Sequence, residues 1–284
     1  MNEIGIRQGR LSPQSIGPIQ RFPRASWKRE FASARDCGFV FIDWLFAADG
    51  FEQNPIWSDA GQDDIRLMVR ATGTSVRSLC ADYFISHPLV RVTDDERTDR
   101  ARVLGRLVLQ SASVGIAIVV VPLLEAGEIR NAADMIECRA SLDEALDLAG
   151  QLSITVALEA DLPAPTLKSF LDLKPHPSLG VCYDTGNAAA KGFDVTADLE
   201  LLGSDLSIVH IKDRDRRGAS VDLGLGIADL QGFFRAADVS CRGPLVLETP
   251  RGDDPLVSAK TNLAFVRRHS AGVSVPCLDG RASR

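Results

Sequence analysis

Four residues that can bind a metal ion stand at the ends of four apolar segments in the second half of the chain. They are Glu159 after residues 154–158, Asp184 after 179–183, His210 after 206–209 and Glu248 after 244–247. Burying a carboxylate is costly unless it is paired or coordinates a cation. Three acids and an imidazole form an oxygen and nitrogen set that suits Mn²⁺, Zn²⁺, Mg²⁺ or Co²⁺ without selecting among them. The pattern therefore predicts one divalent-metal centre.

A metal ion in such a set could act on a sugar. It can chelate a carbonyl and the neighbouring hydroxyl, act as a Lewis acid and ease formation of an enediolate. A carboxylate can then remove a proton from the carbon beside the carbonyl. Glu159 and Glu248 come from non-adjacent strands, so one could take this proton and the other return it on the opposite face. The alternative for each charged residue is that it begins a solvated loop.

Weaker candidates for substrate binding lie near these positions. Lys212, Arg214, Arg216 and Arg217 form a basic run that could bind a sugar phosphate, because arginine forks match phosphate geometry, or could be a solvated charge run. His87 could line the site from the loop after the third predicted strand, or could serve in capping or packing. Both sets are hypotheses for the substrate side of the site.

The elements that must position these residues form a repeating pattern. Strands are predicted at 3–7, 39–46, 74–84, 116–122, 154–158, 179–183, 206–209 and 244–247, and eight helical segments alternate with them. This alternation implies parallel pairing, and eight units in about 250 residues match a closed (β/α)₈ TIM barrel. The functional rim of such a barrel is at the carboxyl ends of the strands, where all four candidate ligands stand. An open doubly wound sheet would carry a glycine-rich phosphate turn after the first strand, and Gly5 and Gly9 do not match it.

Capping signals mark several helix boundaries. Ser26 can cap a helix that Gly38 ends. Thr93 and Glu96 form a capping box, and residues 141 and 144 are read as a second one that opens the last part of a helix ending near 150. We expect one barrel domain over residues 1–270 and a flexible tail over 271–284.

Composition narrows the class of partner. A formal charge of −6 in 284 residues argues against nucleic acid and anionic membranes, which usually bind basic faces. The longest apolar run, 116–124, is far shorter than the roughly 20 residues needed to span a bilayer, and no secretory signal is visible. Six cysteines without a Cys-x-x-Cys spacing read as reduced thiols in a cytoplasmic protein. We expect a small-molecule substrate.

Several motifs resemble one family of barrels. They are Gly5-Ile6-Arg7-Gln8-Gly9-Arg10-Leu11, Ala81-Asp82-Tyr83-Phe84, Asp184-Thr185-Gly186-Asn187, His210-Ile211-Lys212-Asp213, Gly224-Leu225-Gly226 and Leu247-Glu248-Thr249-Pro250, with Glu159 on the fifth strand. Together they resemble the xylose-isomerase-like TIM barrel superfamily, and more narrowly its sugar phosphate isomerases/epimerases, with ketose 3-epimerases as relatives. The resemblance covers most of the chain.

The resemblance implies a fold, a metal and roles for residues. It implies one divalent ion, commonly Mn²⁺ or Zn²⁺, held by Glu159, Asp184, His210 and Glu248, with the two glutamates also acting as acid and base. It further implies that Asn187 and an arginine six residues beyond the histidine contact the sugar. That arginine would be Arg216, with Arg214 and Arg217 competing for the role.

The sequence thus predicts a metal-dependent isomerase or epimerase of a sugar or sugar phosphate. A keto-inositol-type dehydratase would use the same ion and base, and a non-catalytic ligand-binding barrel is the alternative outside enzymes. Cleavage of abasic DNA, also found on this barrel, is disfavoured because those relatives bind three metals with more histidines, and this acidic chain has only 4. The particular sugar, its phosphorylation, the outcome of proton transfer, the metal and any homo-oligomer stay open.

Overall fold

Eight parallel strands close into a barrel in the computed structural model, which describes residues 2–13, 21–241 and 243–270. The strands are β1 (Ile4–Arg7), β2 (Phe41–Leu45), β3 (Ser75–Cys80), β4 (Ile118–Leu123), β5 (Thr155–Ala160), β6 (Leu179–Asp184), β7 (Leu206–Ile211) and β10 (Leu245–Leu247). They pair in chain order, and β10 closes the ring between β7 and β1. The predicted (β/α)₈ TIM barrel is confirmed.

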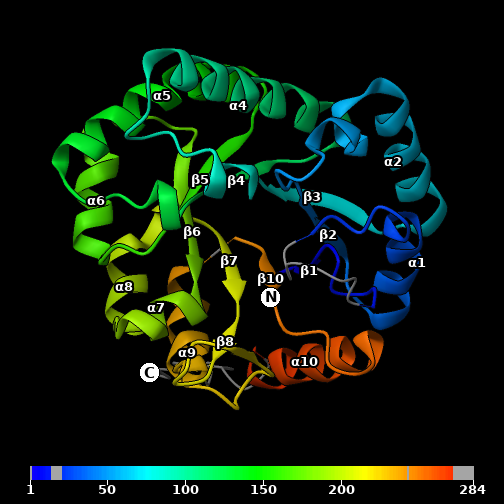
Figure 1. The fold of residues 1–284 in the computed structure, drawn as a ribbon. Helices are drawn as coiled ribbons and strands as arrows, with labels where there is room; N and C mark the ends of the chain where they lie inside the picture. Colours follow the sequence, from blue (N-terminus) through cyan, green and yellow to red (C-terminus); the bar gives the residue numbers. More distant parts are fainter. Residues whose placement is uncertain (1, 14–20, 242, 271–284) are drawn as a thin grey trace, which may run out of the picture.

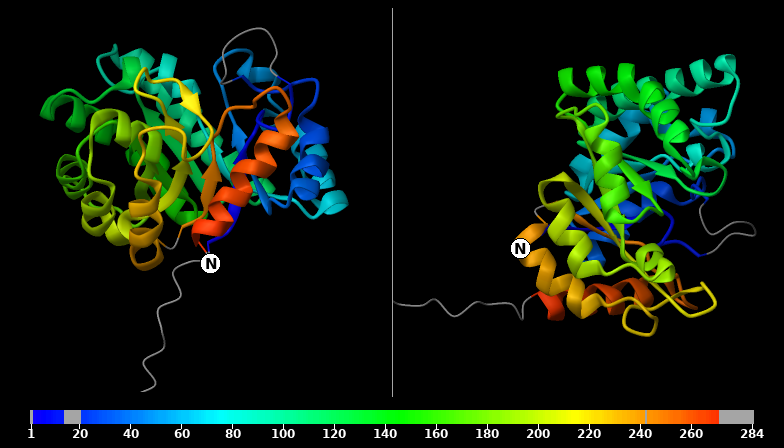
Figure 2. Two further views of the ribbon diagram at one scale, coloured as in Figure 1. Left: turned by 90° about the horizontal axis from the view of Figure 1, so that it is seen from below. Right: turned by 90° about the vertical axis from the view of Figure 1, so that its left-hand side faces the viewer.

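Helices form an outer ring around these strands (Figure 1). They are α1 (Trp27–Cys37), α2 (Asp59–Thr72), α3 (Tyr83–Ser86), α4 (Asp94–Val114), α5 (Ala132–Gln151), α6 (Ala164–Asp172), α7 (Thr185–Lys191), α8 (Val195–Leu202), α9 (Leu230–Ser240) and α10 (Pro255–Ser270). A small antiparallel hairpin, β8 (Asp213–Arg214) with β9 (Ser220–Val221), follows β7. It stands at one end of the barrel (Figure 2, yellow).

The barrel interior has an apolar layer below a polar one. Seven buried residues, one from each strand except β1, form the apolar layer: Phe41, Cys80, Val120, Ala157, Cys182, Ile208 and Val246. Side chains two residues apart on a strand point to the same face. The next inward positions are Asp43, Asp82, Pro122, Glu159, Asp184, His210 and Glu248. All but Pro122 are ionisable, so a layer of mostly ionisable side chains lies directly above the closed core.

Some predicted boundaries are wrong, each for a local reason. Ser141 does not open a helix, because α5 runs unbroken through it from its N-cap, Asn131. The Ser141 hydroxyl instead donates to the carbonyl of Glu137 one turn earlier. Ser26 and Gly38 do flank α1 as predicted, with Gly38 in the left-handed conformation, but the Ser26 side chain makes no capping bond. The third strand ends at Cys80, since Tyr83 already belongs to α3. The capping box of Thr93 and Glu96 at the start of α4 is confirmed.

The described cysteines agree with the prediction of reduced thiols. Cys37, Cys80, Cys138, Cys182 and Cys241 are free and buried, and Cys277 lies outside the described residues.

In the described ranges, no helix has both the length and the apolarity needed to cross a membrane. The predicted tail, 271–284, also lies outside the described residues, so the domain boundary at 270 stays a prediction.

Candidate metal centre and active site

The four predicted ligands meet at the rim of the barrel. Glu159 lies near the end of β5, Asp184 ends β6, His210 lies in β7 and Glu248 directly follows β10. His210 Nδ1 is 3.5 Å from Glu159 Oε2 and 3.5 Å from Glu248 Oε2. One donor atom from each of Asp184, His210 and Glu248 lies within 4.8 Å of the others. All four side chains are buried, His210 completely.

Several polar atoms in this cluster lack a hydrogen-bond partner. Both ring nitrogens of His210 and Oδ2 of Asp184 are buried without one. Nδ1 of His210 lies 3.5 Å from two glutamate oxygens and Oδ2 of Asp184 lies 3.6 Å from Nζ of Lys212, and these distances are longer than those of good hydrogen bonds. A divalent cation would satisfy one of the His210 nitrogens and Oδ2 of Asp184, because neutral imidazole and carboxylate oxygens are its usual ligands. The donor set and its unsatisfied atoms therefore fit a metal ion.

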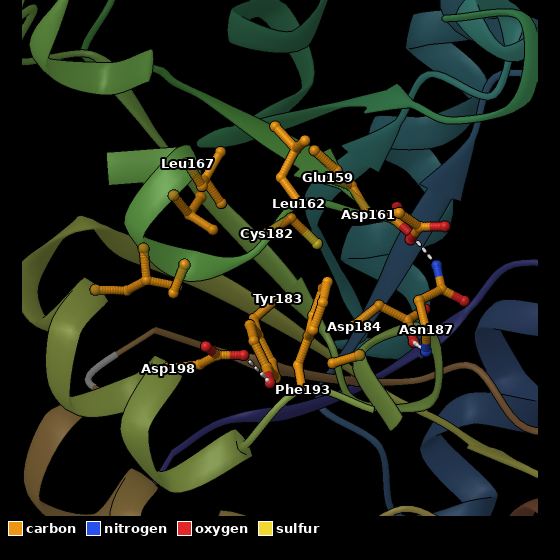
Figure 3. Close-up of a pocket in the computed structure, with 15 residues that line it drawn as sticks. Glu159, Asp161, Leu162, Leu167, Cys182, Tyr183, Asp184, Asn187, Phe193 and Asp198 are labelled. Atoms are coloured by element: carbon orange, nitrogen blue, oxygen red, sulfur yellow. Dashed lines mark hydrogen bonds between the residues drawn. The ribbon is translucent and has the colours of Figure 1, made fainter. Parts of the chain in front are cut away.

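Asn187 connects two of these ligands. Its backbone N–H donates to Oδ1 of Asp184 at 2.8 Å, which caps the start of α7. Its side-chain amide donates to Oε1 of Glu159 at 3.3 Å (Figure 3). Arg214 in turn donates two hydrogen bonds to the amide oxygen, at 3.2 and 2.7 Å. Asn187 is thus oriented from both ends of its side chain.

Lys212 lies against two other ligands. Its Nζ is 2.7 Å from Oε1 of Glu248 and 3.6 Å from Oδ2 of Asp184. Burial alone would raise the pKa of Glu248, but Lys212 and then Arg7 hold that pKa well below the ordinary value of a glutamate. Burial would lower the pKa of Lys212, but Glu248 and Asp184 raise it. The pair is therefore an ammonium and a carboxylate at neutral pH.

A cavity of about 190 Å³ opens over the cluster. Its lining residues are Arg7, Arg10, Asp82, Ile85, Pro122, Leu124, Glu125, Glu159, Asn187, Lys212, Arg214, Ser220 and Glu248. Asn187, Lys212 and Arg214 of the predicted substrate contacts therefore line it, with both catalytic candidates. Arg216 is exposed on the β8–β9 hairpin and is not among the lining residues. His87 is not among them either, because its ring stacks on Tyr83 with centroids 4.2 Å apart.

A second buried polar group beside the cavity was missed in the sequence. Arg7 donates to Oδ2 of Asp43 at 2.9 Å and to Oδ1 of Asp82 at 2.6 Å, and Ser78 donates to the other oxygen of Asp43 at 2.6 Å. The signal was present, since Asp43 stands inside a strand of large apolar residues. To interpret this signal one must know which side chains of β2 point into the barrel, and only the closed ring of strands defines that.

Asp213 of the His-x-Lys-Asp motif has a structural role. Its carboxylate accepts backbone N–H bonds from Arg214, Gly224, Gly226 and Ala228, at 2.9 to 3.0 Å. A Cβ on Gly226 would lie 2.1 Å from Oδ1 of Asp213. The Gly-Leu-Gly turn is therefore folded around this aspartate, which fixes the loop that carries Arg214.

Fold and site together define a TIM barrel with a cluster of buried metal-type ligands at the carboxyl ends of its strands. A family model described as xylose isomerase-like TIM barrel matches residues 31–269. The chain belongs to this family.

Named relatives agree with the fold. The Escherichia coli (strain K12) protein named "Putative L-ribulose-5-phosphate 3-epimerase SgbU" is 23% identical over 250 residues, which cover 82% of this chain and 87% of SgbU. A solved L-ribulose 3-epimerase superposes with a TM-score of 0.76, 16% identity and 95% coverage of each chain. D-psicose 3-epimerase from Clostridium cellulolyticum H10, solved with D-tagatose, gives a TM-score of 0.75 at 15% identity, covering 94% of this chain and 99% of that one.

Proposed function

We propose that the protein is a metal-dependent epimerase or isomerase that acts on a small sugar or sugar phosphate by proton transfer beside a carbonyl. One observation carries the proposal. Two carboxylates from non-adjacent strands place an oxygen at the same distance, 3.5 Å, from one histidine nitrogen, and both line the cavity above it. Paired carboxylates around one reacting centre suit removal of a proton by one and its return by the other.

The metal ligands in this proposal are Glu159, Asp184, His210 and Glu248. A divalent cation held by them would polarise the substrate carbonyl and stabilise the negative charge that develops on its oxygen. Mn²⁺ and Zn²⁺ are the first candidates, with Mg²⁺ and Co²⁺ compatible with the same ligands.

Side chains of the protein would remove the proton and return it. One of Glu159 and Glu248 takes it from the carbon beside the carbonyl, and the other returns it to the opposite face. Return to the same carbon gives the epimer, whereas return to the neighbouring carbon exchanges aldose and ketose. The buried position of both carboxylates keeps water away from the intermediate.

Asn187 and Arg214 are the proposed sugar contacts on the α7 side, and Lys212 and Arg10 line the cavity beside Glu248. The names of SgbU and of the two solved epimerases support a pentulose, a hexulose or a phosphate of one of these as substrate. Cationic side chains around the cavity are compatible with hydroxyls and with a phosphate, so both classes belong in the test.

The test is proton exchange in D₂O. The Mn²⁺-loaded protein is incubated with a panel of ketoses and ketose phosphates, and deuterium at the carbon beside the carbonyl is followed by NMR. We expect incorporation with at least one substrate. Glu159→Gln and Glu248→Gln should each reduce it by about 10²-fold or more. Glu144→Gln, which changes an exposed glutamate on α5, is the matched control.

The products separate the alternatives. A deuterated epimer or isomer supports the proposal, whereas loss of water from a keto-inositol would assign a dehydratase. Absence of exchange across the panel, with no metal bound, would favour a non-catalytic binding barrel. Exchange that persists in both glutamine variants would remove these glutamates from the acid and base roles.

A further inference from the structure

We propose that Lys212 is a built-in counter-ion of the ligand cluster, which holds the carboxylates together and at the same time weakens the binding of a divalent cation. The inference rests on the metal centre of the proposed function. It adds a role for a residue that coordinates no metal and controls how tightly the ion is held.

The contacts of Lys212 place its charge among the ligands. The ammonium is within hydrogen-bond distance of Glu248 and 3.6 Å from Asp184, so one cation bridges carboxylates from β10 and β6. The lysine side chain is only 9% exposed. A buried ion pair is screened far less than a surface pair, so its effect on a nearby ion is large.

The backbone around Lys212 fixes this position. Its N–H donates to Thr185 Oγ1 at 2.9 Å, and the same hydroxyl donates to the Lys212 carbonyl at 2.6 Å. A Cβ on Gly186 would lie 2.9 Å from Cγ of Lys212, so the glycine leaves room for the lysine stem. Thr185 and Gly186, which follow the Asp184 ligand, therefore hold the backbone of Lys212 and leave space for its side chain. A solvated surface lysine would need neither residue.

A count of charges gives the consequence. The cluster contains three carboxylates, a neutral imidazole when it binds metal, and the ammonium of Lys212. One ammonium and one divalent cation together balance the three carboxylates. Arg10 adds a further positive charge 3.7 Å from Oε1 of Glu248. Without Lys212, the carboxylates would repel one another more strongly and attract a cation more strongly.

The direction in which metal affinity changes when Lys212 is removed distinguishes a counter-ion from a residue that only orients a metal ligand. A group that only orients a metal ligand makes metal affinity fall, typically 10- to 100-fold, when it is removed. A counter-ion makes affinity rise when it is removed, because it repels the metal. Lys212 also orients Glu248, and we infer that the repulsion outweighs this orientation.

The experiment measures binding of Mn²⁺, without substrate, by competition with a fluorescent chelator, and thermal unfolding of the metal-stripped protein. Wild type is also tested with Zn²⁺, Mg²⁺ and Co²⁺. The variants are Lys212→Gln, which keeps a hydrogen-bond donor, and Lys212→Met, which keeps the stem. Lys212→Arg keeps the charge. Lys191→Gln is the matched control, because Lys191 pairs with Asp161, at 3.5 Å, and not with a proposed ligand.

We expect the two neutral variants to bind Mn²⁺ about tenfold tighter or more, and to unfold at a lower temperature than wild type when stripped of metal. Lys212→Arg and Lys191→Gln should stay close to wild type in affinity. A neutral variant that folds only with Mn²⁺ present would also support the proposal. Unchanged or weaker binding in the neutral variants overturns the role of Lys212 and leaves the metal centre standing. Failure of wild type to bind Mn²⁺, Zn²⁺, Mg²⁺ or Co²⁺ overturns the metal centre itself.

Discussion

Arg214 donates two hydrogen bonds to the side-chain oxygen of Asn187, from Nε at 3.2 Å and from Nη2 at 2.7 Å. An amide whose oxygen is held in this way must turn its NH₂ group in the other direction, and that group donates to Glu159. Arg214 therefore sets the orientation of a hydrogen bond to one of the two proposed acid–base residues while lining the cavity itself.

The first prediction concerns this arginine. Arg214→Met should lower kcat/KM for the substrate found in the exchange assay by about 10- to 100-fold, because a charge-assisted contact to the sugar and the orientation of Asn187 are both lost. Arg216→Met should have a much smaller effect, since Arg216 is exposed on the hairpin. Steady-state kinetics of the two variants decide which arginine serves the substrate. A larger loss in Arg216→Met would assign the contact to Arg216, as the family resemblance implies.

Strand ends were the part of the site that the sequence could predict. A buried strand that stops on a carboxylate or a histidine is visible as a pattern, and barrel topology brings such ends to one rim. The choice between Arg214 and Arg216 was not visible in the same way. It depends on a two-residue hairpin strand and on the loop that Asp213 organises, and short irregular loops carry no periodicity.

The wrong prediction of a capping box at Ser141 and Glu144 has a different cause. The spacing of Ser141 and Glu144 matches a capping box, but the same spacing occurs by chance within a continuous helix. Whether it opens a helix depends on the residues before it, and in α5 the helix already began at Ala132. The buried contacts of Arg7 with Asp43 and Asp82 could not be found by periodicity either, because they join β1 to β2 and to the residue that precedes α3.

A second prediction tests Asp213 as the organiser of the loop. Asp213→Ala would leave four backbone N–H groups without their carboxylate acceptor. We expect a loss of about 2 kcal/mol or more in the free energy of unfolding, measured by urea denaturation. Asp215→Ala is the matched control, since Asp215 accepts two backbone bonds within the exposed hairpin, and it should cost less. Equal losses in both variants would contradict a special role for Asp213.

A third prediction concerns pH and the buried Glu30. Its carboxylate accepts bonds from the Gly9 N–H at 2.8 Å and the Ser12 hydroxyl at 2.7 Å, but burial dominates and raises its pKa above the ordinary 4.5. The folded protein therefore holds the proton more tightly than the unfolded chain does. Stability is lost as pH rises from about 4.5 through the raised pKa, because ionising a buried carboxyl costs free energy.

Unfolding of wild type and Glu30→Gln should be compared at several pH values. We expect the variant to lack this pH-dependent loss, so that its stability relative to wild type increases with pH across that window. Because both proteins share every other titrating group, their difference isolates Glu30. A difference that stays constant with pH would show that Glu30 titrates alike in the folded and unfolded chains.

The last prediction tests the packing beneath the site. A Cβ on Gly5 would lie 2.3 Å from the ring of Phe41, inside the apolar layer that supports the ionisable one. Gly5→Ala should therefore cost about 1–3 kcal/mol of unfolding free energy, as overpacked cores do. Adding Phe41→Leu removes the ring atoms that the new methyl group meets, so the double variant should lose less than the two single variants together. Both are measured by urea denaturation as a double-mutant cycle. Additive losses would mean that the two side chains do not compete for the same space, and that Gly5 is required for another reason.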